Sequence, residues 1–150
     1  MQTIHGDITQ VTSGIILHQV NCQNAMGSGV AKALYIKWPI IKTAFHEFSE
    51  FKTPESRLGK LQGVYITPAL IVANSFSQLN YGNSYKTKII YTNMPALISN
   101  INRAHKIAVQ NKTYLYIPDH VGCGLAGGNW ETLLLQIKHL ENLIIVKLQP

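Results

Sequence analysis

The chain has 150 residues, of which 46% are hydrophobic and 13% are charged, a balance typical of one globular domain and unlike that of a disordered chain. The formal net charge of +6 reflects a scarcity of acids, with seven Asp and Glu against 13 Lys and Arg. Because the lysines are scattered along the sequence, they favour a general attraction for anionic ligands over a nucleic-acid-binding footprint.

Strand-like and helix-like runs alternate along the chain, as judged from β-branched content, apolar periodicity and helix caps. In chain order they are strand Gln2–His5, strand Gly14–Val20, helix Val30–Lys37, helix Ile40–Phe51, strands Gly63–Thr67 and Leu70–Asn74, a helix that begins at Asn93-Met94-Pro95, strand Thr113–Ile117, helix Trp130–Leu140 and strand Leu143–Leu148. Six strands with interspersed helices predict an α/β fold, a three-layer α/β/α sandwich around a six-stranded mixed sheet, formed by residues 1–150 as a single domain.

Other patterns argue against membrane and metal-dependent classes. Apolar runs such as Leu143–Val146 are too short to span a bilayer, and no signal-peptide pattern is visible. Cys22 and Cys123 form no C-x-x-C pair, and the histidines lack metal-ligand spacing. We therefore expect a cytoplasmic, reduced, monomeric protein with no metal and no cofactor.

Two glycine-rich loops are the most informative feature of the sequence. Met26-Gly27-Ser28-Gly29-Val30 and Gly122–Gly128 each follow a strand-like run and lead into a helix-like run. Glycines at such a junction let backbone N–H groups approach an anion, and the helix start adds a favourable dipole. A third loop, Gly6–Thr9, follows the first strand. Since ligands of such sheets bind beyond the strand ends, we expect the three loops to share one cleft that holds a diphosphate.

Two other phosphate-binding motifs fit poorly. No segment spells the P-loop G-x-x-x-x-G-K-[ST]. Gly122-x-Gly124-x-x-Gly127 matches the dinucleotide fingerprint G-x-G-x-x-G, but the next strand ends in Lys147-Leu148-Gln149-Pro150 without the acid that a Rossmann unit needs. A nicotinamide-dependent dehydrogenase is therefore disfavoured.

Three segments together resemble a macro domain. Gly6–Thr9, Val20–Ala31 and Gly122–Glu131 look like the three motifs of that family, in the family's order and across almost the whole chain. The resemblance is strongest to the branch with MGxGxA and GCGL loops, which includes ADP-ribose-1″-phosphate phosphatases and enzymes that remove ADP-ribose from glutamate or nucleic acid. It implies that ADP-ribose binds in the cleft.

The resemblance also implies binding roles. Asp7 would accept a hydrogen bond from the adenine amino group, with a turn-capping aspartate as the alternative, and Ile8 would add backbone contacts beside the base. The diphosphate would lie between two sets of backbone amides, those of Met26, Gly27, Ser28, Gly29 and Val30 and those of Gly122, Cys123, Gly124, Leu125, Ala126 and Gly127.

Four residues are candidates for catalysis. Asn21 would reach the distal ribose or orient a water, unless it only caps the loop backbone. His18 is the leading titrating candidate, because a matching histidine is implicated in a yeast-like phosphatase branch; a buried core histidine is the alternative. Asp119 and His120 are the rival pair, able to polarise a water or simply exposed at a strand end. Cys123 is expected to be a packed thiol rather than a nucleophile.

Departures from the family pattern restrict the chemistry. Enzymes of this branch that act on glutamate or thymidine use a lysine in the loop after the fourth strand, where this chain reads Asn74-Ser75-Phe76-Ser77-Gln78. Ala126 stands where the protein-glutamate enzymes carry aspartate. A lysine adduct is therefore not expected. Phe76, Tyr81 and Tyr85 could flank the distal ribose, or pack in the core or surface, and Ser75 is expected to contact the ligand.

The favoured activity is water-mediated hydrolysis of ADP-ribose 1″-phosphate to ADP-ribose and phosphate. Two alternatives remain: a non-catalytic ADP-ribose reader, and a hydrolase that removes ADP-ribose from a protein or nucleic acid. The expected partner is ADP-ribose or its 1″-phosphate, with an ADP-ribosylated macromolecule as a further candidate.

Overall fold

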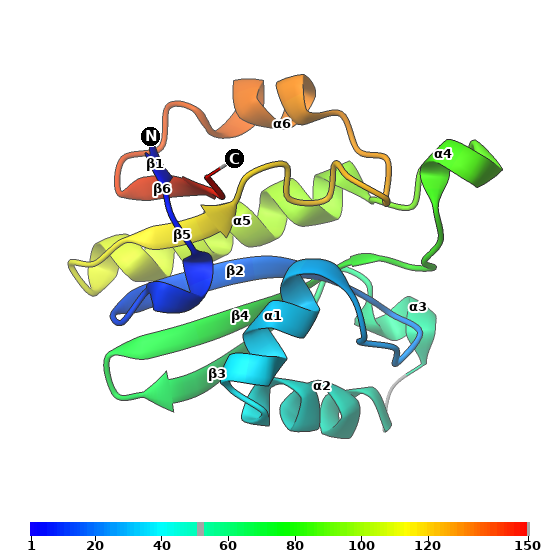
Figure 1. Ribbon diagram of the computed structural model, residues 1–150, viewed down its shortest axis with the longest axis horizontal. Coiled ribbons are helices and arrows are strands. Elements are labelled where there is room, and N and C mark those ends of the chain that lie inside the picture. Colours follow the sequence, from blue (N-terminus) through cyan, green and yellow to red (C-terminus); the bar gives the residue numbers. More distant parts are fainter. Residues whose placement is uncertain (51–52, 150) are drawn as a thin grey trace.

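The computed structural model describes residues 1–50 and 53–149 (Figure 1). Its strands are β1 (Gln2–His5), β2 (Gly14–Asn21), β3 (Leu61–Thr67), β4 (Leu70–Gln78), β5 (Leu115–Pro118) and β6 (Leu143–Lys147). Its helices are a 3-10 turn η1 (Ile8–Gln10), α1 (Gly29–Lys37), α2 (Ile40–Glu50), α3 (Pro54–Arg57), α4 (Ser84–Thr87), α5 (Met94–Gln110) and α6 (Trp130–Ile137).

Within these residues the strands form one mixed sheet in the order β1-β6-β5-β2-β4-β3. The sheet is parallel from β1 to β4, and β3 pairs antiparallel with β4. One face packs against α5 and α6 through residues such as Leu97 and Leu133, and the other packs against α1 and α2 through Leu34 and Phe45 (Figure 1). The predicted three-layer α/β/α sandwich around a six-stranded mixed sheet is confirmed.

The parallel strands determine where a site can form. Because β1, β6, β5, β2 and β4 run in the same direction, their carboxyl ends share one edge of the sheet. The chain leaves this edge into three of the loops that matter here, at Gly6 after β1, at Cys22 after β2 and at Asp119 after β5. Ligands of α/β sheets bind at such an edge.

Local signals set the starts of the long helices as predicted. The side chain of Asn93 accepts a hydrogen bond from the Ala96 amide at 3.0 Å, and that of Asn129 accepts one from Thr132 at 3.0 Å. These caps satisfy amides that a helix start otherwise leaves unpaired. The chain also breaks at Trp38-Pro39, between α1 and α2.

Several predicted bounds were wrong. β4 continues to Gln78 rather than ending at Asn74, because its polar Ser75 and Ser77 find buried hydrogen-bond partners. β3 begins at Leu61, β5 covers Leu115–Pro118, α6 ends at Ile137 and β6 ends at Lys147. Phe51, the last residue of the predicted second helix, lies outside the described residues. η1, α3 and α4 were not predicted, because each is too short to show a helical period.

None of the helices in residues 1–50 and 53–149 combines the length and the apolar character that a bilayer crossing requires.

Candidate functional site

A cleft of about 670 Å³ opens at the carboxyl edge of the sheet. It is lined by His18–Asn21, Ala25–Ala31, Gln78, Tyr81–Asn83, Pro118–Gly122 and Gly124–Ala126. The structure therefore brings both glycine-rich loops to one cavity, although about a hundred residues separate them in sequence. The volume lies within the range of small-molecule sites.

The second glycine-rich loop presents three successive unpaired amides. Its turns are closed by hydrogen bonds from Cys123 N to His120 O (2.8 Å) and from Gly128 N to Gly122 O (3.0 Å). Among the described residues, the N–H groups of Gly124, Leu125 and Ala126 donate no hydrogen bond, and all three residues line the cleft. Consecutive free amides of this kind form an anion-binding concavity.

The first loop brings a helix start to the opposite wall. α1 begins at Gly29, which has a φ of +60° that favours glycine, and the side chain of Ser28 makes no capping hydrogen bond. The amides of the first turn consequently lack a side-chain partner, and Gly29, Val30 and Ala31 line the cleft. A helix start in this condition favours an anion through its amides and its dipole.

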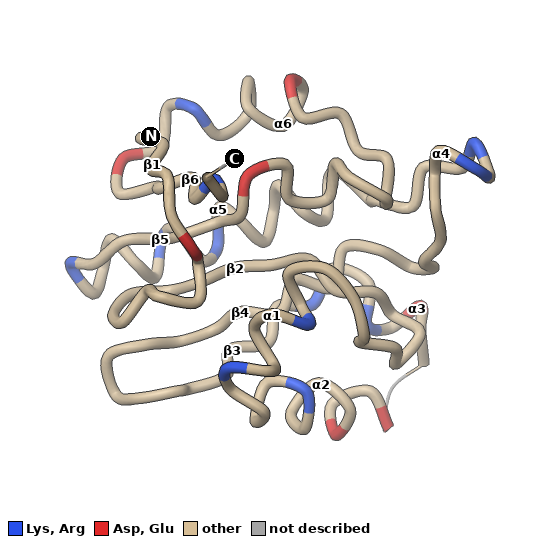
Figure 2. Tube along the Cα trace, viewed as in Figure 1, with Lys and Arg blue, Asp and Glu red and all other residues tan. Residues whose placement is uncertain are grey.

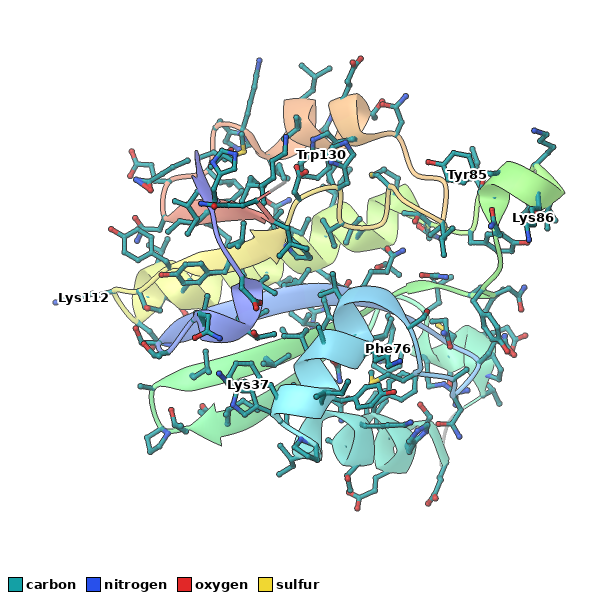
Figure 3. All side chains as sticks on the ribbon, viewed as in Figure 1. Lys37, Phe76, Tyr85, Lys86, Lys112 and Trp130 are labelled. Carbon is teal, nitrogen blue, oxygen red and sulfur yellow. The ribbon has the colours of Figure 1, made fainter. Side chains whose placement is uncertain are left out.

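The side chains of Asp119 and His120 pair in the cleft wall. Asp119 Oδ2 lies 2.9 Å from His120 Nδ1, and the imidazole stacks with 4.9 Å between ring centroids on Trp130, which lies at the start of α6 (Figure 3). The stack and the pair fix the ring, while its Nε2 makes no hydrogen bond within the described part of the chain. His120 side-chain exposure of 54% leaves that nitrogen open to water or ligand. The pair is therefore suited to proton exchange.

His18, by contrast, is sealed beneath the cleft with 1% exposure. Gln62 donates to Ala44 O (2.9 Å), which orients its amide; its Oε1 then accepts from Asn74 Nδ2 (3.0 Å), and Asn74 Oδ1 faces His18 Nε2 at 2.6 Å. His18 Nε2 must therefore carry the proton and donate, and the buried Nδ1 has no hydrogen-bond partner among residues 1–50 and 53–149. Burial lowers the pKa of His18 to about 4, so the ring is neutral at pH 7.

Asn21 shapes the first loop. Its Nδ2 donates to Ala25 O (2.7 Å), and its Oδ1 accepts from the amides of Gln23 (3.0 Å) and Ala25 (3.4 Å). The sheet register also shifts between Val20 and Asn21, which turns this residue out of the regular strand. The side chain lines the cleft, but in the structure its polar atoms serve the loop backbone, the alternative that the sequence left open.

Asp7 lies at the same edge but beside a second hollow. It lines a pocket of about 330 Å³ with Gly6 and Tyr116, and β6 separates its strand β1 from β5. Its Oδ1 accepts from Thr9 Oγ1 (2.7 Å) and Thr9 N (2.9 Å), which lowers the pKa of the carboxyl group below its usual value. In the described chain Oδ2 accepts no hydrogen bond. Ile8, the first residue of η1, is buried.

Six residues expected to contact a ligand do not line the cleft: Asp7, Ile8, Ser75, Phe76, Cys123 and Gly127. Phe76 is fully buried, stacked on Phe45 at 5.7 Å between centroids (Figure 3), and Ser75 is fully buried with its Oγ bonded to Asn100. The expected ligand contacts of Phe76 and Ser75 are therefore wrong. β4 continues through both residues, so their side chains point into the two cores on opposite faces of the sheet. The thiol of Cys123 is half-buried, and burial raises its pKa to about 11, leaving almost no thiolate at neutral pH.

Sequence reasoning missed the residues that hold the second loop in place. Gln19 Nε2 donates to Thr92 Oγ1 (2.9 Å), its Oε1 accepts from Ser77 Oγ (2.8 Å), and Thr92 Oγ1 donates to Gly122 O. Gly122 has a φ of +70°, and a Cβ there would lie 2.9 Å from Gln19 Oε1. The polar Gln19, which follows the apolar run Ile15–Leu17 in β2, was the signal that could have indicated this network.

The chain matches solved structures, although no protein-family profile and no curated protein matches it. A protein of unknown function from Bacteroides thetaiotaomicron is 26% identical with a TM-score of 0.80, over 99% of this chain and 97% of that one. A macrodomain protein from Streptomyces coelicolor is 22% identical with a TM-score of 0.73, over 99% and 98%. DarTG of Thermosipho africanus, solved in complex with ADP-ribose, is 16% identical with a TM-score of 0.71, over 98% and 41%. The chain has the macrodomain fold.

Among the described residues, no three His, Cys, Asp or Glu side chains are placed to hold a metal ion. The cleft offers backbone amides, the Asp119–His120 pair and neutral side chains.

Proposed function

We propose that this macrodomain binds ADP-ribose, with the diphosphate between the two glycine-rich loops. The observation that carries the proposal is the row of three unpaired amides at Gly124, Leu125 and Ala126 in a cleft that also contains the uncapped start of α1. Amides on both sides could neutralise two phosphates that no single loop could surround. The likeness to a DarTG structure that contains ADP-ribose supports the same ligand.

The position of Asp7 indicates which end of the ADP-ribose lies toward β1. Its unpartnered Oδ2 can accept a hydrogen bond from the adenine amino group, with the backbone of Ile8 beside the base. The adenosine half then extends toward the hollow at β1. The distal ribose extends in the opposite direction, past Asn21 toward Tyr81, because the strand order places β4 on the other side of the cleft.

Asp7→Ala is expected to weaken ADP-ribose binding by about 1–3 kcal/mol, because a carboxylate hydrogen bond to the base is lost. The measurement is calorimetry with ADP-ribose and with inosine diphosphate ribose, which lacks the amino group. We expect the analogue to bind the wild-type protein weakly and to be insensitive to Asp7→Ala. Equal losses for both ligands would show that Asp7 acts only as the cap of η1.

For chemistry, we propose that the cleft hydrolyses ADP-ribose 1″-phosphate. Water attacks phosphorus, the bond from phosphorus to the 1″ oxygen breaks, and the ribose oxygen takes up a proton, giving ADP-ribose and phosphate. Of the candidates, the Asp119–His120 pair is best suited to move the proton, because His120 Nε2 is open while His18 Nδ1 is sealed. His18 then has a structural role beneath the site.

A phosphate-release assay with ADP-ribose 1″-phosphate tests this activity. We expect release by the wild-type protein and a loss of about 100-fold or more in His120→Ala. Tight ADP-ribose binding without phosphate release would leave a reader of ADP-ribose. Loss of label from ADP-ribosylated protein or nucleic acid, without phosphate release, would instead indicate the macromolecular hydrolase.

A further inference from the structure

The direction of the free amides in the second glycine-rich loop depends on the carbonyl groups beside them. The peptide bonds of this loop are trans, so each N–H points opposite to the C=O of the preceding residue. Leu125 O accepts from Ser84 N (2.8 Å), and the Ala126 N–H therefore points away from that contact. Gly124 O accepts from Gly127 N (3.0 Å), which directs the Leu125 N–H in the same manner. Groups that hold these carbonyls consequently orient the amides.

Thr92 is bonded to the loop at two carbonyls. Its Oγ1 donates to Gly122 O, and its N donates to Ala126 O (3.2 Å). The three free amides, those of residues 124–126, lie within the stretch between these two contacts. Because a carbonyl oxygen only accepts, the Thr92 hydroxyl must give its one proton to Gly122. The side chain is 8% exposed, so the contact is shielded from water.

The hydroxyl group of Thr92 is itself held in place. Gln19 Nε2 donates to Thr92 Oγ1 (2.9 Å) and to Gln78 Oε1 (3.0 Å), while Gln19 Oε1 accepts from Ser77 Oγ (2.8 Å). The backbone of Thr92 also pairs with that of Gln78 at the end of β4. The bond from Gln19 occupies a lone pair of the hydroxyl oxygen, so its proton stays directed at Gly122.

The second glycine-rich loop contains no cation that could replace the amides. Residues 120–130 contain no Lys or Arg, and Figure 2 shows none along the connection from β5 to α6. Residues 89–102, which include Thr92, contain no charged residue. A phosphate at this wall therefore meets amide dipoles, and their attraction depends on the direction in which they point.

We propose that Thr92 is the positioning residue of the diphosphate site. Its hydroxyl holds the Gly122 carbonyl on the protein side and so keeps the amides of residues 124–126 directed at the ligand. This role rests on the proposed function. Since Gly122 and Gly124 lack side chains, the peptides between them can turn over when the hydroxyl bond is lost. A carbonyl oxygen turned into the cleft would repel phosphate.

Thr92→Val tests the role because it removes the hydroxyl and keeps the branched shape. Calorimetry should show ADP-ribose binding weakened by about tenfold, whereas Thr92→Ser, which keeps the hydroxyl, should stay within about threefold of the wild type. Adenosine, which lacks the diphosphate, should bind all three proteins alike. Equal losses for adenosine and ADP-ribose would show that Thr92 only supports the fold, and would overturn the proposal.

Thr43→Val is the matched control. Thr43 also donates its hydroxyl proton to a backbone carbonyl, that of Pro39 at 3.4 Å, but it lies in α2 and does not line the cleft. This variant should bind ADP-ribose like the wild type. A loss in Thr43→Val equal to that in Thr92→Val would contradict a specific role for Thr92.

Amide hydrogen exchange on the unliganded protein separates this proposal from the proposed function. The Gly128 N–H donates to the same Gly122 carbonyl, so it should exchange about tenfold faster in Thr92→Val than in the wild type or Thr92→Ser. If ADP-ribose fails to bind the wild type, the proposed function fails; faster exchange in Thr92→Val alone would still support the hold on the loop, and equal exchange would overturn it. If ADP-ribose binds the wild type and Thr92→Val equally, the proposed function stands and the positioning role is overturned.

Discussion

Gly27→Asp should weaken ADP-ribose binding by about 10- to 100-fold, roughly 1–3 kcal/mol, without lowering the thermal unfolding midpoint. A Cβ at Gly27 meets nothing within 4 Å, so the new side chain fits the folded chain. Its carboxylate would lie just before the start of α1, in the cleft that also contains the Gly124–Ala126 amides, and would repel the diphosphate. The same charge near a helix start favours the helix, so stability should not fall.

The matched control is Gly27→Asn, which adds nearly the same volume without the charge. We expect a loss of less than about threefold in affinity for this variant, since an amide does not repel phosphate. Equal losses in the Asn and Asp variants would attribute the effect to bulk. Unchanged affinity in both would show that the first loop does not hold the diphosphate.

The free energy of unfolding should fall by about 3 kcal/mol as the pH is lowered from 6.5 to 4, because of His18. In the folded protein burial lowers its pKa from 6.5 to about 4. Between these values the unfolded chain binds a proton that the folded chain does not, so protonation favours unfolding. The stabilisation is complete above pH 6.5 and is lost as the pH falls toward 4. Urea unfolding at several pH values measures it.

His18→Gln is the control for this pH dependence. The glutamine amide can still donate to Asn74 Oδ1 but does not titrate, so its unfolding free energy should change less across the same window. The lowered pKa of Asp7 places its titration below 3.8, outside most of the window. Parallel pH profiles for the two proteins would show that His18 is not the group responsible.

Local signals in the sequence were sufficient for the three-layer fold and for the two loops. Helix caps such as Asn93 and Asn129, the break at Pro39 and the glycines before α1 act within a few residues, so their structural effect can be read from the chain alone. The shared edge of the sheet then follows from parallel pairing, which alternating strands and helices predict.

The features that the sequence did not predict depend on contacts between residues far apart in the chain. The burial of His18 depends on Asn74 and Gln62, 56 and 44 residues away in sequence, and no local pattern reports such a partner. Phe76 was a candidate either to flank the distal ribose or to pack in the core; β4 continues beyond its predicted end at Asn74, and the ring packs in the core.

A crystal structure with ADP-ribose tests the central claim most directly. We expect oxygens of the diphosphate to lie within hydrogen-bond distance of the amides of Gly124, Leu125 and Ala126 and of the first turn of α1, with the adenine toward Asp7. A ligand bound elsewhere, or a diphosphate that faces solvent while those amides stay unpaired, would contradict it.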